Sequence, residues 1–285
     1  MIRLGGHGVG VAPDDPVAFA RAHVAFGYGA AYCPPVEVGD AQRLKAIETA
    51  FADADVTIAE VGIWKNIITP DATERATNLK LAAEKLAIAD AVGARCAVTY
   101  LGSFKAGTDF APAAENFSPE AFDAAVEACR SVIDAVKPRR AKFAVEMMQY
   151  SLPDSIESYL QLIRAVDRPE FAAHFDPVNW IISPRDYFNS GALIKSLFDR
   201  LGAVVVSCHA KDIMLHHKAA LHYDEVVPGK GALDYRTYIA CLDRMPVEVP
   251  LMLEHLEEGQ YAEARDAVYR FGDWAWVQFK HRPNA

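Results

Sequence analysis

Short apolar runs alternate along this chain with longer amphipathic segments. The short runs, such as residues 203–209 (AVVVSCH), have the length of buried strands. The longer segments, such as residues 118–136, repeat apolar positions every three to four residues as helices do. The pattern predicts strands over 2–6, 29–34, 56–64, 95–102, 142–148, 171–177, 203–209 and 249–255. It predicts helices over 16–27, 40–54, 71–92, 118–136, 154–166, 187–201, 234–245 and 261–279.

This alternation is typical of βα units around a parallel sheet. The chain has eight predicted strands, and each is followed by a predicted helix, which is short only over 234–245. Within 285 residues, this pattern predicts an α/β fold, namely a (β/α)8 TIM barrel that forms a single domain over residues 1–285. A doubly wound open sheet is the alternative, but it usually has a glycine-rich phosphate-binding turn after its first strand. The glycines of GGHGVG lack that spacing and are followed by a loop.

Composition and charge exclude several classes of partner. The formal net charge is −9, and the 29 basic residues form no long cluster, so we expect no nucleic-acid partner. The first residues lack the features of a signal peptide, and the apolar runs are too short to span a bilayer. The five cysteines are scattered without a CxxC pair, which predicts reduced thiols. We therefore expect a cytoplasmic protein with no membrane partner.

Four consecutive predicted strands end on a side chain that can bind a metal. These residues are Glu146, Asp176, His209 and Glu254. Barrel chemistry lies at the carboxyl ends of the strands, so the four side chains would meet in one cleft. Three carboxylates forced together repel one another, and a divalent cation would hold all three ionised. Three oxygen donors and one imidazole suit Mn²⁺, Co²⁺, Mg²⁺ or Zn²⁺, so the sequence predicts one divalent metal ion.

The same segments resemble the xylose isomerase-like barrels, a family of sugar and sugar-phosphate isomerases and epimerases that also includes inositol-pathway enzymes and the endonuclease IV group. The resemblance rests on FAVEMM, HFDPVNWI, SCHAKDIM, VVPGKGALDY and PLMLEHL. It implies that the four strand-end residues bind one metal and that Glu146 and Glu254 are the catalytic pair. It also implies that Lys211 and Asp212 lie beside the metal or contact the substrate.

The reaction implied by this resemblance is proton abstraction α to a carbonyl, through a metal-stabilised enediolate. The α-proton of a ketose is too weakly acidic for a free carboxylate, so a cation must stabilise the developing charge. One glutamate would remove the proton and the other would return it. The sequence does not separate epimerisation from isomerisation.

Two positions depart from the ketose 3-epimerases, which have a histidine three residues after the metal aspartate and an arginine six after the metal histidine. This chain has Asn179 and Leu215 there. Asn179 can hydrogen-bond a sugar hydroxyl or cap a turn. Trp180 can stack on a sugar or belong to the core.

Other candidates for substrate binding are His7 and Trp64, which follow predicted strands, and Lys230 on the PGKG turn. A loop after the seventh strand is crowded with His216, His217, His222, Asp224 and Glu225, and we interpret it as solvated, with further metal ligands as the alternative. Strand alternation predicts that His255 faces the helices. It places His174 on the same face as Asp176 but deeper, where we interpret it as a packing residue.

We therefore expect a metal-dependent isomerase or epimerase of a small sugar, sugar phosphate or cyclitol. A metal-dependent lyase or deglycosidase acting on oxidised (3-keto) glycosides is the enzymatic alternative, and an endonuclease IV-like repair protein or a non-catalytic sugar-binding barrel fits less well. The partner expected is a small carbohydrate. Aromatic residues on the last helix suggest a homo-oligomer interface, although packing against the barrel explains most of them.

Overall fold

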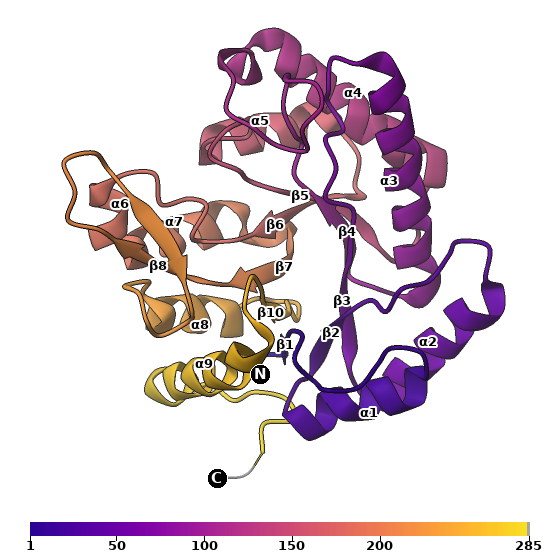
Figure 1. The fold of residues 1–285 in the computed structure, drawn as a ribbon, viewed down its shortest axis with the longest axis vertical. Helices are drawn as coiled ribbons and strands as arrows, with labels where there is room; N and C mark the ends of the chain where they lie inside the picture. Colours follow the sequence, from indigo (N-terminus) through magenta and orange to yellow (C-terminus); the bar gives the residue numbers. More distant parts are fainter. Residues whose placement is uncertain (284–285) are drawn as a thin grey trace.

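Eight parallel strands close into a barrel in the computed structural model, which describes residues 1–283 (Figure 1). The strands are β1 (Leu4–Gly5), β2 (Ala30–Tyr32), β3 (Thr57–Gly62), β4 (Cys96–Thr99), β5 (Lys142–Glu146), β6 (Phe171–Phe175), β7 (Val205–Ala210) and β10 (Leu251–Leu253). Around the barrel they follow the order β1-β10-β7-β6-β5-β4-β3-β2, so each neighbours the next barrel strand in sequence. The predicted barrel is confirmed.

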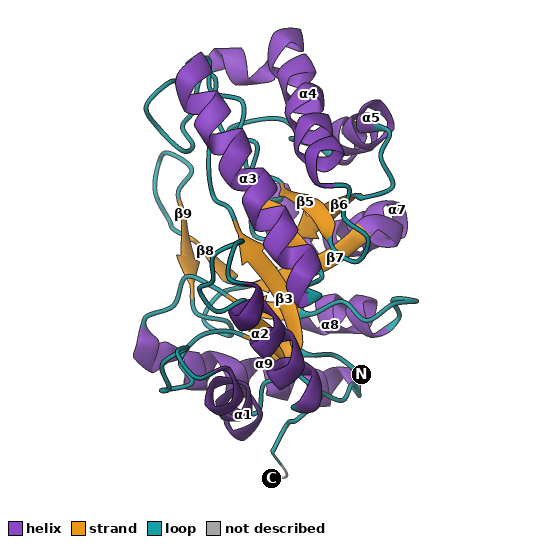
Figure 2. Ribbon diagram, turned by 90° about the vertical axis from the view of Figure 1, so that its right-hand side faces the viewer, coloured by secondary structure: helices purple, strands orange, loops and turns teal. Residues whose placement is uncertain are grey.

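Helices cover the outside of this barrel (Figure 2). They are α1 (Pro16–Phe26), α2 (Ala41–Asp53), α3 (Ala72–Val92), α4 (Pro119–Val136), α5 (Ile156–Val166), α6 (Pro184–Phe188), α7 (Ser190–Leu201), α8 (Tyr235–Asp243) and α9 (Tyr261–Ala275). Short 3₁₀ turns are η1 (Ala114–Phe117), η2 (Gly202–Val204) and η3 (Glu258–Gln260). Among the described residues, no helix combines the length and apolarity that crossing a membrane requires.

Local capping explains where several helices begin and end. The side chain of Asp15 accepts hydrogen bonds from the first turn of α1, and Pro16 occupies its first position. Gly93 ends α3 in the left-handed conformation (φ 73°), which a residue without a Cβ adopts at little cost. Ser118 caps α4 just before Pro119. These boundaries agree with the sequence-based ones.

The structure differs from the prediction at three places. The helix expected over 187–201 is divided at Asn189 into α6 and α7. The last helix ends at Ala275 because Trp276 adopts a left-handed backbone, and Phe279 then forms a bridge with Ile2 beside the barrel. An antiparallel hairpin, β8 (Asp212–Leu215) and β9 (Tyr223–Val226), follows β7 and was not expected. Figure 2 shows this hairpin outside the barrel wall.

Candidate active site

The four residues at the ends of β5, β6, β7 and β10 come together. One ligand atom each from Glu146, Asp176, His209 and Glu254 can be chosen so that all four lie within 4.8 Å of one another. Nδ1 of His209 lies 3.0 Å from a carboxylate oxygen of Glu254 and 3.4 Å from one of Glu146. His209 and Asp176 are buried, and Glu254 keeps 17% of its side chain exposed. The cluster is therefore open to ligands on one side only.

The hydrogen bonding of this cluster tests whether a cation fits. Nδ1 of His209, Oδ2 of Asp176 and Oε2 of Glu254 are buried and make no hydrogen bond of normal geometry; their polar contacts are within the cluster and with the ammonium of Lys211. Buried polar atoms normally make hydrogen bonds, and a bound ion is one of the common explanations when they do not. These atoms are the donors that Mn²⁺, Co²⁺, Mg²⁺ or Zn²⁺ accepts in proteins. The residues present thus fit one divalent cation.

Lys211 brings a buried positive charge to the same cluster. Its Nζ lies 2.9 Å from Asp176, 2.6 Å from Glu254 and 3.8 Å from Glu225, and its side chain is 4% exposed. Burial disfavours the ammonium, but Asp176, Glu146 and Glu254 outweigh burial and hold the pKa of Lys211 well above its ordinary value. Lys211 is therefore a fixed cation that offsets part of the carboxylate charge.

Glu60 was missed by the sequence analysis because it lies in the middle of β3. Its fully buried carboxylate contacts Nε2 of His174 at 3.0 Å and Nε2 of His209 at 3.3 Å, and it accepts a hydrogen bond from Ser207. Burial opposes the charge, but the two histidines hold the pKa of Glu60 well below its ordinary value. Because an ionised carboxylate only accepts, His209 must donate through Nε2, which leaves Nδ1 facing the ligand cluster.

Asn179 lies in the cavity above the cluster, whereas Trp180 lies in the core. Nδ2 of Asn179 donates to Oε1 of Glu146 over 2.9 Å, and Asn179 lines the cavity above the cluster. Trp180 is 5% exposed and stacks on Tyr159, with ring centroids 6.3 Å apart. The expected contact of Trp180 with substrate is therefore corrected, because the ring belongs to the core.

Asp212 also departs from its expected role. It is 1% exposed, and its two oxygens accept from four backbone N–H groups, those of Ile213, Gly229, Gly231 and Leu233. A Cβ at Gly231 would lie 2.3 Å from one of these oxygens, so the turn approaches as closely as glycine permits. Asp212 fixes the segment after the hairpin and does not contact the cavity.

Lys230 lies outside the cavity above the ligand cluster. Its side chain is 57% exposed and forms an ion pair of 2.5 Å with Glu263 at the start of α9. It lines a separate, smaller hollow with His255 and Glu225. The expected substrate contact by Lys230 is not supported by this position.

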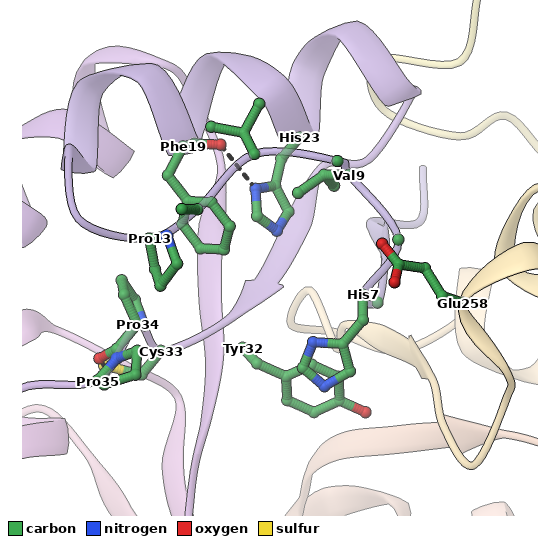
Figure 3. Close-up of a pocket in the computed structure, with 15 residues that line it drawn as sticks. His7, Val9, Pro13, Phe19, His23, Tyr32, Cys33, Pro34, Pro35 and Glu258 are labelled. Carbon is green, nitrogen blue, oxygen red and sulfur yellow. Dashed lines mark hydrogen bonds between the residues drawn. The ribbon is translucent and has the colours of Figure 1, made fainter.

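Trp64 and His7 line two different cavities at the barrel mouth. The ring of Trp64 lies 6.1 Å from that of His209, at the floor of the cavity above the ligand cluster. His7 lines a neighbouring cavity of about 520 Å³ beside α1, where its ring stacks on Tyr32 with centroids 4.6 Å apart (Figure 3). His7 therefore does not share the cavity that Trp64 lines.

Histidines of the hairpin and of the segment after β10 contact carboxylates. His255 does not face the helices: β10 ends at Leu253, the backbone of His255 is left-handed (φ 54°), and Nδ1 lies 3.1 Å from Glu225 in the cavity wall. Strand alternation no longer applies beyond the end of a strand. His216 and His222 contact Asp224 at 2.7 and 3.1 Å on the hairpin, with side chains 32% and 43% exposed.

The cavity above the ligand cluster has a volume of about 500 Å³. Its floor carries Glu146, Glu254, Asn179 and Lys211, and aromatic and aliphatic side chains form much of its walls. Ligand pockets in proteins usually combine such apolar walls with a few convergent polar groups. The arrangement can hold a cation, place two carboxylates around a small polar molecule and shield it from water.

Comparisons with known proteins agree with this fold. The sequence matches the xylose isomerase-like TIM barrel family over residues 21–271. No curated protein sequence gave a significant match.

Solved structures share the fold at low identity. A 3-keto-D-glucoside 4-epimerase from E. coli has 12% identity and a TM-score of 0.69, covering 95% of this chain and 100% of that one. An L-ribulose 3-epimerase has 16% identity and a TM-score of 0.68, covering 97% and 96%. A xylose isomerase-like TIM barrel protein from Mycobacterium smegmatis, in complex with magnesium, has 16% identity and a TM-score of 0.67, covering 97% and 98%. From the family match over most of its length, the chain belongs to the xylose isomerase-like TIM barrel family.

Proposed function

We propose that this protein is a divalent-metal-dependent isomerase or epimerase of a carbohydrate carbonyl compound. The observation that carries the proposal is the convergence of Glu146, Asp176, His209 and Glu254 at the floor of a ligand-sized cavity, where three of their buried donor atoms make no hydrogen bond of normal geometry. The sugar epimerases among the structural relatives support the same class of substrate.

Each residue has a role that follows from its position. Glu146, Asp176, His209 and Glu254 would hold the cation, which would supply positive charge to substrate oxygens when bound. Glu146 and Glu254 would also exchange the proton on the carbon beside the carbonyl. In the barrel, β5 and β10 are separated by two strands, so the two carboxylates approach the cavity from different sides. That placement suits removal of a proton at one face and its return at the other.

Asn179 and Lys211 would position these groups. Through its hydrogen bond, Asn179 Nδ2 orients the Glu146 carboxylate, while its amide oxygen remains able to accept from a sugar hydroxyl. Lys211 forms ion pairs with Asp176 and Glu254 and can donate to a substrate oxygen.

A phosphodiester substrate fits this cavity poorly. The described lining residues of the cavity include no arginine, and its one lysine, Lys211, already contacts carboxylates. Nucleic-acid phosphates are bound mainly by Arg and Lys side chains and backbone N–H groups. This favours the carbohydrate reaction over a nuclease.

The test is incorporation of solvent deuterium. Protein reconstituted with Mn²⁺ is incubated in D₂O with a panel of ketoses, inososes and keto-glycosides, and deuterium at carbon is followed by NMR. The proposal predicts exchange at the carbon beside the carbonyl for at least one compound, and its loss in Glu254→Gln. The product then distinguishes epimerisation, isomerisation and elimination. Absence of exchange across the panel with a metal-loaded protein would contradict the proposal.

A further inference from the structure

The walls of the cavity above the ligand cluster point to the substrate class. An aromatic row, which consists of Trp64, Tyr100 and Phe110, leads from the metal ligand His209 toward solvent. Ring centroids are 6.1 Å apart for Trp64 and His209, 5.9 Å for Trp64 and Tyr100, and 5.5 Å for Tyr100 and Phe110. All three aromatic side chains line the same cavity of about 500 Å³.

Trp64, at the inner end of this row, has an energetically unfavourable backbone conformation. Trp64 has a left-handed backbone (φ 50°), which costs a non-glycine residue energy and persists only where the surroundings enforce it. A Cβ at Gly62 would lie 2.4 Å from Nε1 of Trp64, so glycine at that position makes room for the indole. Such outliers cluster at ligand sites.

Phe110, at the outer end of the row, is exposed, but its loop is held in place by contacts with the rest of the barrel. Phe110 is 48% exposed, a position where its ring buries little surface. Its loop is nevertheless fixed to the end of β3 by the Lys65–Asp109 ion pair at 2.8 Å and by Asn66, which donates to the carbonyl of Thr108 over 3.0 Å. The ring packs edge-to-face against Tyr100, and the rest of its surface stays free for a ligand in the cavity.

The row offers apolar ring surface and few polar groups, and its rings are tilted, by 37° between Trp64 and Tyr100 and by 69° between Tyr100 and Phe110. The hydroxyl of Tyr100 donates to the carbonyl of Trp64 over 3.1 Å, so it is already used within the protein. Phe110 has no polar side-chain atom. The metal side of the cavity is polar, whereas this side suits a flat apolar group.

The cavity also lacks the features of a phosphate site among the described residues. The basic side chains in its wall, Lys211 and His255, contact carboxylates. None of its lining residues belongs to the first turn of a helix, where barrel proteins frequently bind phosphate.

We infer that the ligand of this cavity is an unphosphorylated glycoside with an aromatic aglycone. The sugar would lie over Glu146 and Glu254, and the aglycone would pack against the apolar surface of Trp64, Tyr100 and Phe110. This inference rests on the proposed function for the position of the sugar. Because a glycoside has no open-chain carbonyl, the carbonyl needed for proton exchange would be a ketone in the sugar ring, supplied by a preceding oxidation.

The test is calorimetric titration of the Mn²⁺-loaded protein with matched probes. These are the phenyl and methyl glycosides of glucose, galactose and xylose, with glucose 6-phosphate as the anionic probe. We expect the phenyl form of at least one sugar to bind about tenfold tighter than its methyl form, and glucose 6-phosphate to bind more weakly than either.

Phe110→Ala provides the site-specific variant. It should lose about 3- to 10-fold in affinity for the phenyl glycoside and leave the methyl glycoside unchanged. Phe117→Ala is the matched control, because Phe117 has nearly the same exposure, 47%, and does not line the cavity. An equal loss in both variants would overturn the assignment.

The remaining outcomes separate this inference from the proposed function. Equal binding of phenyl and methyl glycosides, no binding of either, or tighter binding of glucose 6-phosphate would overturn the inference even if deuterium exchange is observed. A phenyl preference that Phe110→Ala removes, in a protein that exchanges no deuterium with any keto-glycoside, would support the inference and contradict the proposed function.

Discussion

Two groups of buried polar side chains meet at His209, and they differ in the contacts of their carboxylates. On one side, Glu60 accepts hydrogen bonds from both imidazoles and from Ser207. On the other side, Oδ2 of Asp176 and Oε2 of Glu254 lie near Lys211, but these contacts lack the geometry of a hydrogen bond. Both groups contain carboxylates and histidine and could hold a metal by residue type. The difference teaches that the hydrogen bonding of the carboxylates, rather than composition, separates a supporting group from a ligand site.

Loss of one of the metal-binding side chains should have the largest effect on the affinity for metal. Asp176→Asn removes the charge of a buried carboxylate that would bind the metal directly, so the affinity for Mn²⁺ should fall by more than the roughly 10- to 100-fold typical of residues behind a ligand. Titration of the protein with Mn²⁺, followed by electron paramagnetic resonance, measures this. Glu225→Gln, which removes a partly exposed carboxylate of the cavity wall, is the control and should change the affinity much less.

Loss of the supporting carboxylate should have a smaller effect. Glu60→Gln removes the charge behind His209, so Mn²⁺ affinity should fall about 10- to 100-fold. Ser207→Ala removes a different hydrogen bond to Glu60 and leaves the imidazole contacts, so it should keep most of the affinity. If the serine variant lost as much as the glutamine variant, the role of Glu60 in orienting His209 would be wrong. Thermal unfolding of both variants separates misfolding from weak binding.

A buried histidine outside both groups sharpens the comparison. His23 in α1 is 1% exposed and has no carboxylate partner; burial lowers its pKa to about 4, although its hydrogen bond to the carbonyl of Phe19 opposes this. The unfolded chain therefore binds a proton below pH 6.5 that the folded one binds only near pH 4. The free energy of unfolding should therefore decrease as the pH is lowered from about 6.5 to about 4.

Urea unfolding at pH 7 and pH 5 measures this effect. The free energy of unfolding should decrease by about 2 kcal/mol more in the native protein than in His23→Gln. His222→Gln, on the exposed hairpin, should behave like the native protein. If the unfolding free energy of His23→Gln depended on pH as strongly as that of the native protein, groups other than His23 would cause the dependence.

The hairpin cluster should show the smallest effect. His216, His222 and Asp224 also form a potential ligand set, but they are partly exposed and already contact one another. The variant His216→Ala with His222→Ala should keep the native metal content, measured by elemental mass spectrometry. Loss of one equivalent would mean that the hairpin, rather than the barrel, holds the metal.

The sequence predicted the fold and the four strand-end residues because both depend on local pattern. Apolar runs define the strands, and the first charged residue after a run marks the carboxyl end of a barrel strand. Glu60 was not predicted because it interrupts an apolar run in the middle of β3, where a single glutamate gives no signal until its partners from β6 and β7 are known.

The remaining corrections have tertiary causes. Trp180 stacks on Tyr159 from another element, and Asp212 is satisfied by backbone groups up to twenty-one residues later in the chain. His255 lies in the cavity wall because its backbone turns left-handed after β10. None of these relations is encoded in strand periodicity.

The most direct test of the account is the metal content of gently purified protein beside that of a Glu146→Gln, Glu254→Gln double variant. The account predicts about one equivalent of Mn, Co, Mg or Zn in the native protein and its loss in the variant, with circular dichroism unchanged. A native protein that takes up no divalent metal after reconstitution with Mn²⁺, or a double variant that keeps its full equivalent, would contradict it.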